Sequence, residues 1–340
     1  MTDRSPVRQA EALIEASPAA AMRVLGPYLT TEPDDWRALC LAAQAQVGLD
    51  DPARALDYAR RASQLNPHSD WPVRLQTIAH RDLGHSYDAQ QLSRQSVLIN
   101  PANWQTHLLV ANADLAARSV NHHSLAAARK SRELAPAEPE THIVVGQVAL
   151  DLGLKKEAVQ AFERALQMAP DNAVARHELA RAQLRRGRVG RALDGFLATG
   201  RLDPTIRQVR ANLHNIIARV IQLLHYVVLA GCLLSPFDGP LAGALVVLAW
   251  LAALAWAGKR GGRPLLRVLA GVPRADPMLF GWAVALLGSS ALLVLRGVLT
   301  LGKPAGTSAA SPLSGLAFLL LFVGAACTWL RRARPPRVGR

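Results

Sequence analysis

Residues 140–170 read ETHIVVGQVALDLGLKKEAVQAFERALQMAP, and this stretch contains the pattern that decides the fold. Its first half places apolar side chains at steps of three and four residues, as expected for a helix with one buried face. Gly153 interrupts that pattern, and a second amphipathic stretch then continues until Pro170 ends it. The segment therefore predicts two helices joined by a tight turn.

The same plan recurs along the first 205 residues. Residues 36–67 carry Gly48 and Asp50-Asp51-Pro52 between two helix-like stretches, and residues 173–204 carry Gly187 at the matching place. A period near 34 residues is typical of stacked helix–turn–helix units. One interval is 35 residues, and we expect its extra residue near SVNHHS at 119–124, between the two helices of that unit. The prolines that mark the period are Pro33, Pro67, Pro101, Pro136, Pro170 and Pro204.

Small and aromatic residues also recur at fixed places within the units. Small residues allow two helices to approach closely, and an aromatic ring fills the space between units. This pattern resembles the tetratricopeptide repeat family, and it implies a partial or capping repeat over residues 1–34 and five repeats over residues 35–205. The residues that carry the resemblance are Gly146, Ala158, Phe162 and Ala165, then Ala180, Ala192 and Phe196, and in the earliest complete unit Ala43, Ala55, Ala59 and Ala62.

The last part of the chain, residues 206–340, has a different composition. Four long apolar runs occupy residues 220–237, 239–257, 278–295 and 313–330. Each approaches the length of about 20 residues that a helix needs to cross a bilayer. The sequence thus predicts an all-α protein, in which a solenoid of helical hairpins is followed by a bundle of about four transmembrane helices. Buried helices of a soluble domain are the alternative.

The distribution of charge supports the membrane interpretation. Residues 211–340 contain 13 Lys and Arg but only two acidic residues, so most of the net charge of +14 lies there. The basic residues are dense before the first run, between the second and third, and after the fourth, which predicts a multi-pass protein of the inner membrane with both termini in the cytoplasm. No nucleic-acid motif accompanies the charge, so we expect a lipid bilayer and no nucleic acid as partner.

No pattern in the sequence indicates an enzyme. The three cysteines are far apart, and the adjacent His122 and His123 make a poor metal pair because they point in different directions on a helix. His107 and His142 occupy matching places in successive units, which indicates repeat architecture. We therefore expect no catalytic residue, metal ligand, cofactor or small-molecule substrate.

The resemblance to the repeat family also implies where a protein or peptide partner binds. In that family the first helices of successive units line a concave groove. The matching residues here are polar and mostly basic, which suits an extended peptide with acidic residues or a free C-terminal carboxylate; they are equally consistent with plain solvated helix faces. The predicted groove residues are Arg37, Gln44, Trp71, Arg74, Arg81, Gln105, Asn112, Gln147, His177 and Arg181.

Two functions follow from these features. The first is a bacterial membrane-anchored scaffold or adaptor, whose cytosolic repeats bind a protein or peptide partner at the inner face of the membrane. The alternative is a transporter or membrane enzyme, in which the spans are active and the repeats regulate them.

Overall fold

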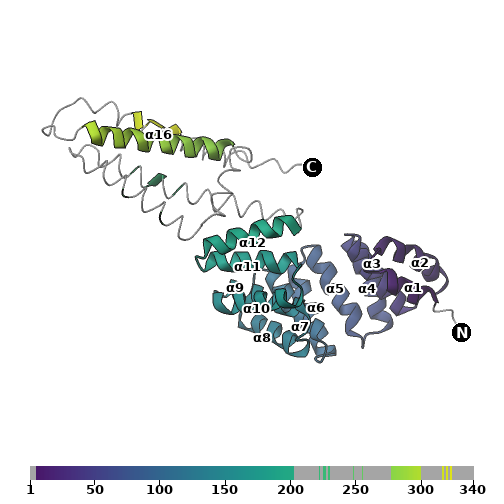
Figure 1. Ribbon diagram of the computed structural model, residues 1–340. Coiled ribbons are helices and arrows are strands. Elements are labelled where there is room, and N and C mark those ends of the chain that lie inside the picture. The colour runs from purple at the N-terminus through teal and green to yellow at the C-terminus, as the bar shows by residue number, and fades with distance from the viewer. Residues whose placement is uncertain are drawn as a thin grey trace. The chain divides into compact units, whose positions relative to one another are not determined.

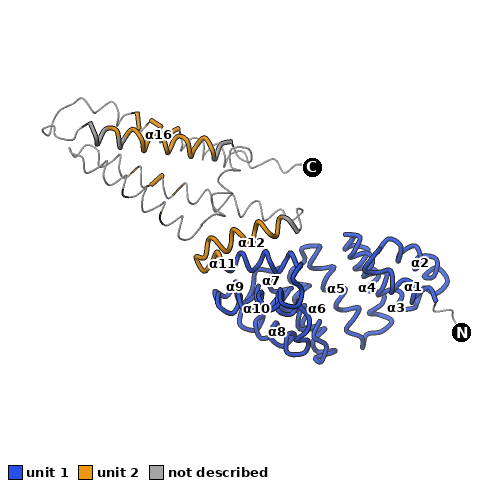
Figure 2. Tube along the Cα trace, viewed as in Figure 1, with its two compact units in different colours: residues 1–182 blue, residues 183–340 orange. Residues whose placement is uncertain are grey.

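The computed structural model describes residues 5–202 and 277–299, together with isolated positions between residues 222 and 323. Every regular element in the described ranges is an α-helix (Figure 1). The chain forms two compact units, residues 1–182 and residues 183–340 (Figure 2). The division falls inside a helix, whereas the sequence analysis ended the repeats at residue 205.

Unit 1 is built from a regular series of helices. The helices are α1 (Ser5–Leu13), α2 (Pro18–Thr31), α3 (Trp36–Gly48), α4 (Pro52–Leu65), α5 (Asp70–Asp82), α6 (Ser86–Ile99), α7 (Trp104–Ala116), α8 (His122–Leu134), α9 (Pro139–Asp151), α10 (Lys155–Met168) and α11 (Ala173–Arg185), the last of which ends in unit 2. Helices α1 to α10 contact in consecutive pairs, and each second helix also contacts the first helix of the next pair. This arrangement confirms the predicted solenoid of helical hairpins.

The helix ends lie where local chemistry predicts them. The second helices end at Leu65, Ile99, Leu134 and Met168, each two residues before one of the periodic prolines. Proline has no backbone N–H and cannot continue a helix, so each proline begins the next connection. The first helices begin beside side chains that accept hydrogen bonds from free backbone N–H groups, and these caps are Asp35, Ser69 and Asn103.

The turns inside the hairpins explain why glycine recurs there. Gly84 and Gly153 each have a φ of 79°, and Gly187 has a φ of 75°. This left-handed conformation is costly for residues with a Cβ atom. In the turn before α4 the positive φ belongs to Asp50, not to Gly48. Gly48 instead lies against α2, because a Cβ atom there would be 2.7 Å from Cγ of Pro18.

The extra residue of the third full unit lies between its two helices, as the sequence predicted. Residues 117–121 connect α7 to α8, whereas residues 83–85 suffice between α5 and α6. Arg118 takes a positive φ of 53° in the longer connection. Asn121 then starts α8 with a capping box, in which its side chain accepts hydrogen bonds from backbone N–H groups and its own N–H donates to Ser124.

Packing between α9 and α10 brings an aromatic ring against a glycine within one unit, whereas the sequence predicted that the ring fills the space between units. Phe162 is completely buried, and Ala158 and Ala165 beside it on α10 are buried as well. Gly146 of α9 has no side chain, and the Phe162 ring fills the space where one would lie. Burying such a ring stabilises the fold by roughly 2–3 kcal/mol.

Unit 2 contains α12 (Val189–Leu202) and α16 (Pro277–Leu299) in its described parts. The predicted span 278–295 falls within α16, whereas the predicted spans 220–237, 239–257 and 313–330 lie outside the described residues except for isolated positions. Among the described residues, no helix combines the length and the apolar character that crossing a bilayer requires. The four spans therefore stay predictions from the sequence.

Candidate partner-binding surface

The first helices of the repeats form a row within unit 1. Helix α3 contacts α5, α5 contacts α7, and α7 contacts α9. All ten predicted groove residues lie on these four helices or on α11. We call the side of the helices that carries them the first-helix surface. Eight of the ten side chains are half-buried, Arg37 is exposed, and His177 is only 3% exposed and therefore lies beneath this surface.

Arg74 is the centre of a polar network on this surface. Its Nε donates to Oδ2 of Asp70 at 2.8 Å, and its Nη1 donates to Oε1 of Gln105 on α7. Asp70 also accepts hydrogen bonds from Nδ2 of Asn103 at 2.7 Å and Nδ2 of Asn100 at 3.2 Å. The structure thus brings together two predicted residues, Arg74 and Gln105, and connects them to an acidic residue that the sequence analysis did not include.

An aromatic cluster lies at the α3 end of the same surface. The rings of Trp36 and Trp71 meet edge to face, with centroids 6.3 Å apart and planes at 81°. The guanidinium of Arg37 lies 5.4 Å from the centroid of the Trp36 ring, within the range of a cation–π interaction. Sequence reasoning found Trp71 and Arg37 but missed Trp36, although its position directly before Arg37 at the start of the helix was a usable signal.

Arg81 and Arg181 also have acidic partners on their own chain. Arg81 contacts Asp82 at 2.9 Å, and Arg181 contacts Glu178 at 2.7 Å. Burial raises the pKa of Glu140 on α9, and the positive charge of Arg81 on α5 lowers it in part. Three of the four arginines in the predicted set therefore already face a carboxylate. The surface is less basic than the predicted residues alone indicated, because Asp70, Asp82 and Glu178 neutralise three of the arginines.

Side-chain amides recur along the surface at the period of the repeat. One position of the first helix is Gln44, Ile78, Asn112, Gln147 and Arg181 in five successive units. Three of these five side chains are amides. All three amide side chains are half-buried. An amide both donates and accepts hydrogen bonds, so these groups suit the backbone of an extended segment.

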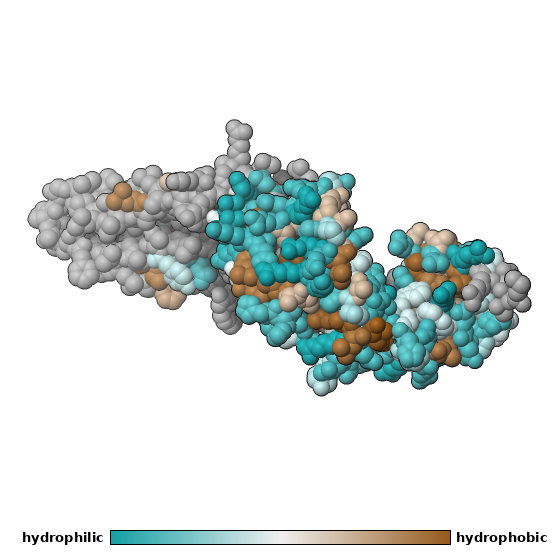
Figure 3. All heavy atoms as spheres, turned by 90° about the horizontal axis from the view of Figure 1, so that it is seen from below, coloured by the Kyte–Doolittle hydropathy of each residue, from teal (hydrophilic) through white to brown (hydrophobic). Residues whose placement is uncertain are grey.

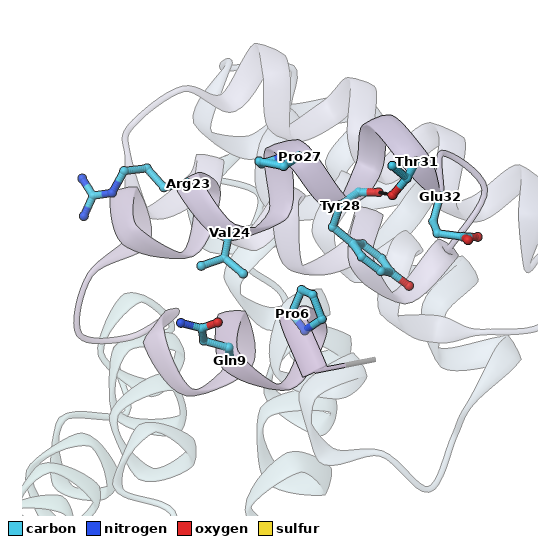
Figure 4. A pocket seen from close by; sticks show the side chains of 8 residues that line it. All are labelled: Pro6, Gln9, Arg23, Val24, Pro27, Tyr28, Thr31 and Glu32. Atoms are coloured by element: carbon cyan, nitrogen blue, oxygen red, sulfur yellow. Dashed lines mark hydrogen bonds between the residues drawn. The ribbon is translucent and has the colours of Figure 1, made fainter. Parts of the chain in front are cut away.

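Two hollows lie elsewhere in unit 1, and neither is lined by a predicted groove residue. The first has a volume of about 480 Å³ and opens between α1 and α2. Figure 4 shows Pro6 and Gln9 of α1 opposite Val24 and Tyr28 of α2, with the Thr31 hydroxyl donating to the Tyr28 carbonyl at 2.9 Å. No cluster of ionisable groups converges there, so we assign it no chemistry.

The second hollow has a volume of about 410 Å³ and lies beside Asp114 of α7. This buried carboxylate accepts hydrogen bonds from Nε2 of Gln90 and from the Ser124 hydroxyl, both at 2.6 Å. The guanidinium of Arg94 is 3.9 Å away and is largely exposed. The acid ties α6, α7 and α8 together, which is a structural role.

The histidines at matching places have the structural role that the sequence indicated. Nε2 of His107 bonds the carbonyl of Pro101 at 2.9 Å, and Nε2 of His142 bonds the carbonyl of Pro136 at 3.0 Å. Arg176 donates to the carbonyl of Pro170 from the same place in the next unit. The prediction of repeat architecture is confirmed, because in three successive units the side chain six residues after the periodic proline bonds the carbonyl of that proline.

The comparisons with known proteins agree with this fold. Residues 149–213 match a family model described as a tetratricopeptide repeat. The repeats resemble the Pseudomonas aeruginosa protein pilF, with a TM-score of 0.51 and 14% identity over 62% of this chain and 96% of that one. They also resemble a chain of the APC/C hetero-tetramer Cut9-Hcn1, with a TM-score of 0.53 and 14% identity over 57% of this chain and 38% of that one.

A repeat protein of Thermus thermophilus, described as a thermophilic tetratricopeptide repeat protein, shares 19% identity over 52% of this chain and 96% of its own, with a TM-score of 0.47. No curated protein matches the sequence. The matched model and the two structures with the higher scores support a tetratricopeptide-like helical solenoid in the repeat region.

Proposed function

We propose that this protein is an interaction scaffold, whose first-helix surface binds a protein or peptide partner. The observation that carries the proposal is the continuous row of contacts from α3 through α5 and α7 to α9, which places the aromatic, amide and arginine side chains of successive units on one surface. Tetratricopeptide-like repeats are typical of scaffolds of this kind, and a surface that spans several repeats suits an extended segment.

The charges on the surface restrict the chemistry of the partner. Arg37 is exposed beside Trp36 and Trp71, so it is the arginine best placed to meet a carboxylate from outside. Arg74 is already paired with Asp70 and Gln105, so an external carboxylate that bound its remaining N–H groups would meet the negative charge of Asp70 beside it. We therefore propose an extended peptide with an acidic residue or a free C-terminal carboxylate, seated at the α3 end and followed by backbone contacts along the amides.

Polar side chains predominate among the residues assigned to the first-helix surface. On the face drawn in Figure 3, hydrophilic residues predominate over the repeats, and hydrophobic residues form smaller patches. A groove that binds an amphipathic helix would instead present a continuous apolar stripe. The polar side chains of the first-helix surface favour hydrogen bonding and ion pairing as its mode of recognition.

The proposal includes a membrane anchor formed by the C-terminal part of the chain. Its support is the four apolar runs and the basic residues that flank them, whose distribution favours both termini in the cytoplasm. Extraction of isolated membranes with alkaline carbonate tests the anchor, because a peripheral protein is released and an integral one stays in the pellet. Release of the chain into the supernatant would contradict the anchor without affecting the proposed peptide surface.

The partner surface is tested by affinity capture with the tagged full-length chain from a detergent extract. We expect Arg37→Glu, Arg74→Glu and Arg181→Glu to reduce capture of the partners found with the unaltered chain. Arg164→Glu is the matched control, because Arg164 is an exposed arginine of α10, a second helix outside this surface. Circular dichroism of each variant establishes that the repeats stay folded. If the three surface variants capture the same proteins in the same amounts as Arg164→Glu, the proposed surface is wrong.

A further inference from the structure

Three potential metal ligands converge where α5 ends and α6 begins. His80 lies in the last turn of α5, His85 directly precedes α6, and Asp88 lies in the first turn of α6. One ligand atom from each residue lies within 4.8 Å of the others. Nδ1 of His80 is 3.6 Å from Oδ2 of Asp88, and the two imidazole rings have centroids 5.5 Å apart.

The backbone of the turn holds the three residues in this arrangement. Gly84 takes a φ of 79° and reverses the chain, and the backbone N–H of His85 donates to the carbonyl of His80 at 2.8 Å. This hydrogen bond closes the turn, and α6 begins at the next residue. The backbone of the hairpin therefore fixes the spacing of the three residues, and rotation of their side chains is enough to bring the ligand atoms around one metal ion.

The buried nitrogen of His80 is the second observation that points to a ligand. The residue is only 7% exposed, and within the described structure its Nδ1 is buried without a hydrogen-bond partner. The 3.6 Å separation from Asp88 is too long for a hydrogen bond. Buried polar atoms are nearly always bonded, so an unpartnered nitrogen at this place points to a ligand.

We propose that His80, His85 and Asp88 form a binding site for a divalent transition-metal ion, with Zn²⁺ the best match. Two imidazole nitrogens and one carboxylate oxygen are a typical set for zinc, with the fourth position left to water. Ligand atoms in a tetrahedral site of this type lie about 3.4 Å apart, which follows from bond lengths near 2.1 Å. The His80–Asp88 distance is already close to that value, and the exposed His85 side chain can rotate inward.

The groups that face His80 set the charge of the site. Burial lowers the pKa of His80, Asp88 raises it in part, and Arg60 and His85 lower it. Arg60 opposes a bound cation, whereas the carboxylate of Asp88 attracts one. A metal ion held here would fasten the end of α5 to the start of α6.

The test uses the full-length protein, purified in detergent without a polyhistidine tag and freed of metal with a chelator. Titration with Co²⁺ should give visible absorption bands typical of four-coordinate cobalt at one equivalent per chain, and Zn²⁺ should remove them. Asp88→Asn and His85→Ala should each weaken Co²⁺ and Zn²⁺ binding by about tenfold or more, since even indirect contacts to a metal contribute on that scale. Zn²⁺ should also raise the unfolding midpoint of the unaltered protein and not that of these variants.

The matched control is the double variant His122→Ala/His123→Ala, which removes two exposed histidines at the start of α8. It should bind Co²⁺ as the unaltered chain does. His85→Ala and Asp88→Asn change residues with exposed side chains, and circular dichroism verifies that they fold. The proposal is overturned if the unaltered chain shows no saturable uptake, if uptake is the same in His85→Ala and Asp88→Asn, or if only the control variant loses it.

Discussion

The Phe162 ring of α10 lies so close to Gly146 of α9 that a Cβ atom at residue 146 would be 2.5 Å from Cε1 of that ring. Carbon atoms that are not bonded to each other rarely come nearer than about 3.5 Å. The contact joins the two helices of one hairpin. Phe162 belongs to the main cluster of buried side chains in this region, and Gly146 lies directly against it. The distance between these two helices is therefore set by the absence of a side chain at residue 146.

We expect Gly146→Ala to destabilise the protein by about 1–3 kcal/mol, although alanine is the better helix former, because the added methyl group overpacks the contact with Phe162. Thermal or urea unfolding followed by circular dichroism measures the change. Combining it with Phe162→Leu should cost less than the sum of the two single changes, because the smaller side chain makes room.

Gly153→Ala is the control for this pair. Its Cβ atom would meet nothing within 4 Å, but its φ of 79° is unfavourable for alanine. We expect a loss of about 1–2 kcal/mol from the backbone alone, and that loss should add to the effect of Phe162→Leu without any rescue. If Phe162→Leu reduced the loss of stability equally in Gly146→Ala and Gly153→Ala, the contact with the ring would not explain the effect of Gly146→Ala.

Cys40 should resist alkylation in the folded protein. Burial raises the pKa of its thiol to about 12, while Arg74 lowers it in part and Asp35 raises it. The thiolate is the reactive form, so almost none is present at neutral pH. Treatment with iodoacetamide followed by peptide mass mapping should find Cys40 unmodified in native buffer and modified in denaturant. Complete modification in native buffer would contradict the burial of this thiol.

Removing the carboxylate of Asp114 should weaken the middle of the solenoid. In Asp114→Ala, Gln90 and Ser124 each lose the acceptor that they bond at 2.6 Å. Nε2 of Gln90 still donates to the Ser119 hydroxyl, but the completely buried hydroxyl of Ser124 loses its acceptor. A buried donor left without a partner costs about 1–3 kcal/mol, and we expect a loss of that size in urea unfolding. Asp57→Ala, an exposed residue of α4, is the control and should change the stability by less than about 0.5 kcal/mol. Equal effects of the two changes would count against the role of Asp114.

His142 should make the stability of the repeats depend on pH. Burial lowers its pKa below the ordinary value of 6.5, Arg132 and Arg164 also lower it, and the hydrogen bond to the Pro136 carbonyl raises it in part. The unfolded chain therefore takes up a proton at a higher pH than the folded chain. The contribution of His142 to the free energy of unfolding is complete above pH 6.5, where its imidazole is neutral in the folded and the unfolded chain. This contribution is lost as the pH falls through the lowered pKa of the folded state.

The unfolding midpoint measured between pH 8 and pH 5 checks this sign. A difference of one bound proton gives a slope of at most about 1.4 kcal/mol per pH unit. His142→Gln should reduce the slope below pH 6.5, whereas His122→Gln, at an exposed position, should leave it unchanged. A slope that stays the same in His142→Gln would assign the pH dependence to other groups.

The fold of the repeats was predictable because local chemistry determines it. Proline cannot continue a helix and glycine adopts a positive φ at little cost, so Pro170, Gly153 and their counterparts mark the helix ends whatever surrounds them. Gly146 and Phe162 were recognised as packing positions from the repeat, but their contact lies within one unit, whereas the sequence predicted that the ring fills the space between units.

The details of the candidate sites depend on contacts between units or across turns. Arg74 reaches Gln105 because α5 and α7 are neighbours, and no spacing rule within one helix contains that contact. The convergence of His80, His85 and Asp88 required the turn at Gly84 to be known. The burial of His177 was missed because it depends on how closely the neighbouring helices cover it.

The ion pair between Arg74 and Asp70 has a consequence for selectivity. Asp70 already neutralises the charge of Arg74, so a foreign carboxylate at the remaining N–H groups meets a negative charge beside it. A small solitary anion therefore gains little from Arg74 alone. A longer ligand that also offers its backbone to Gln105 and Asn112 gains affinity through several contacts at once. Around Arg74, the surface thereby favours a chain over a small solitary anion.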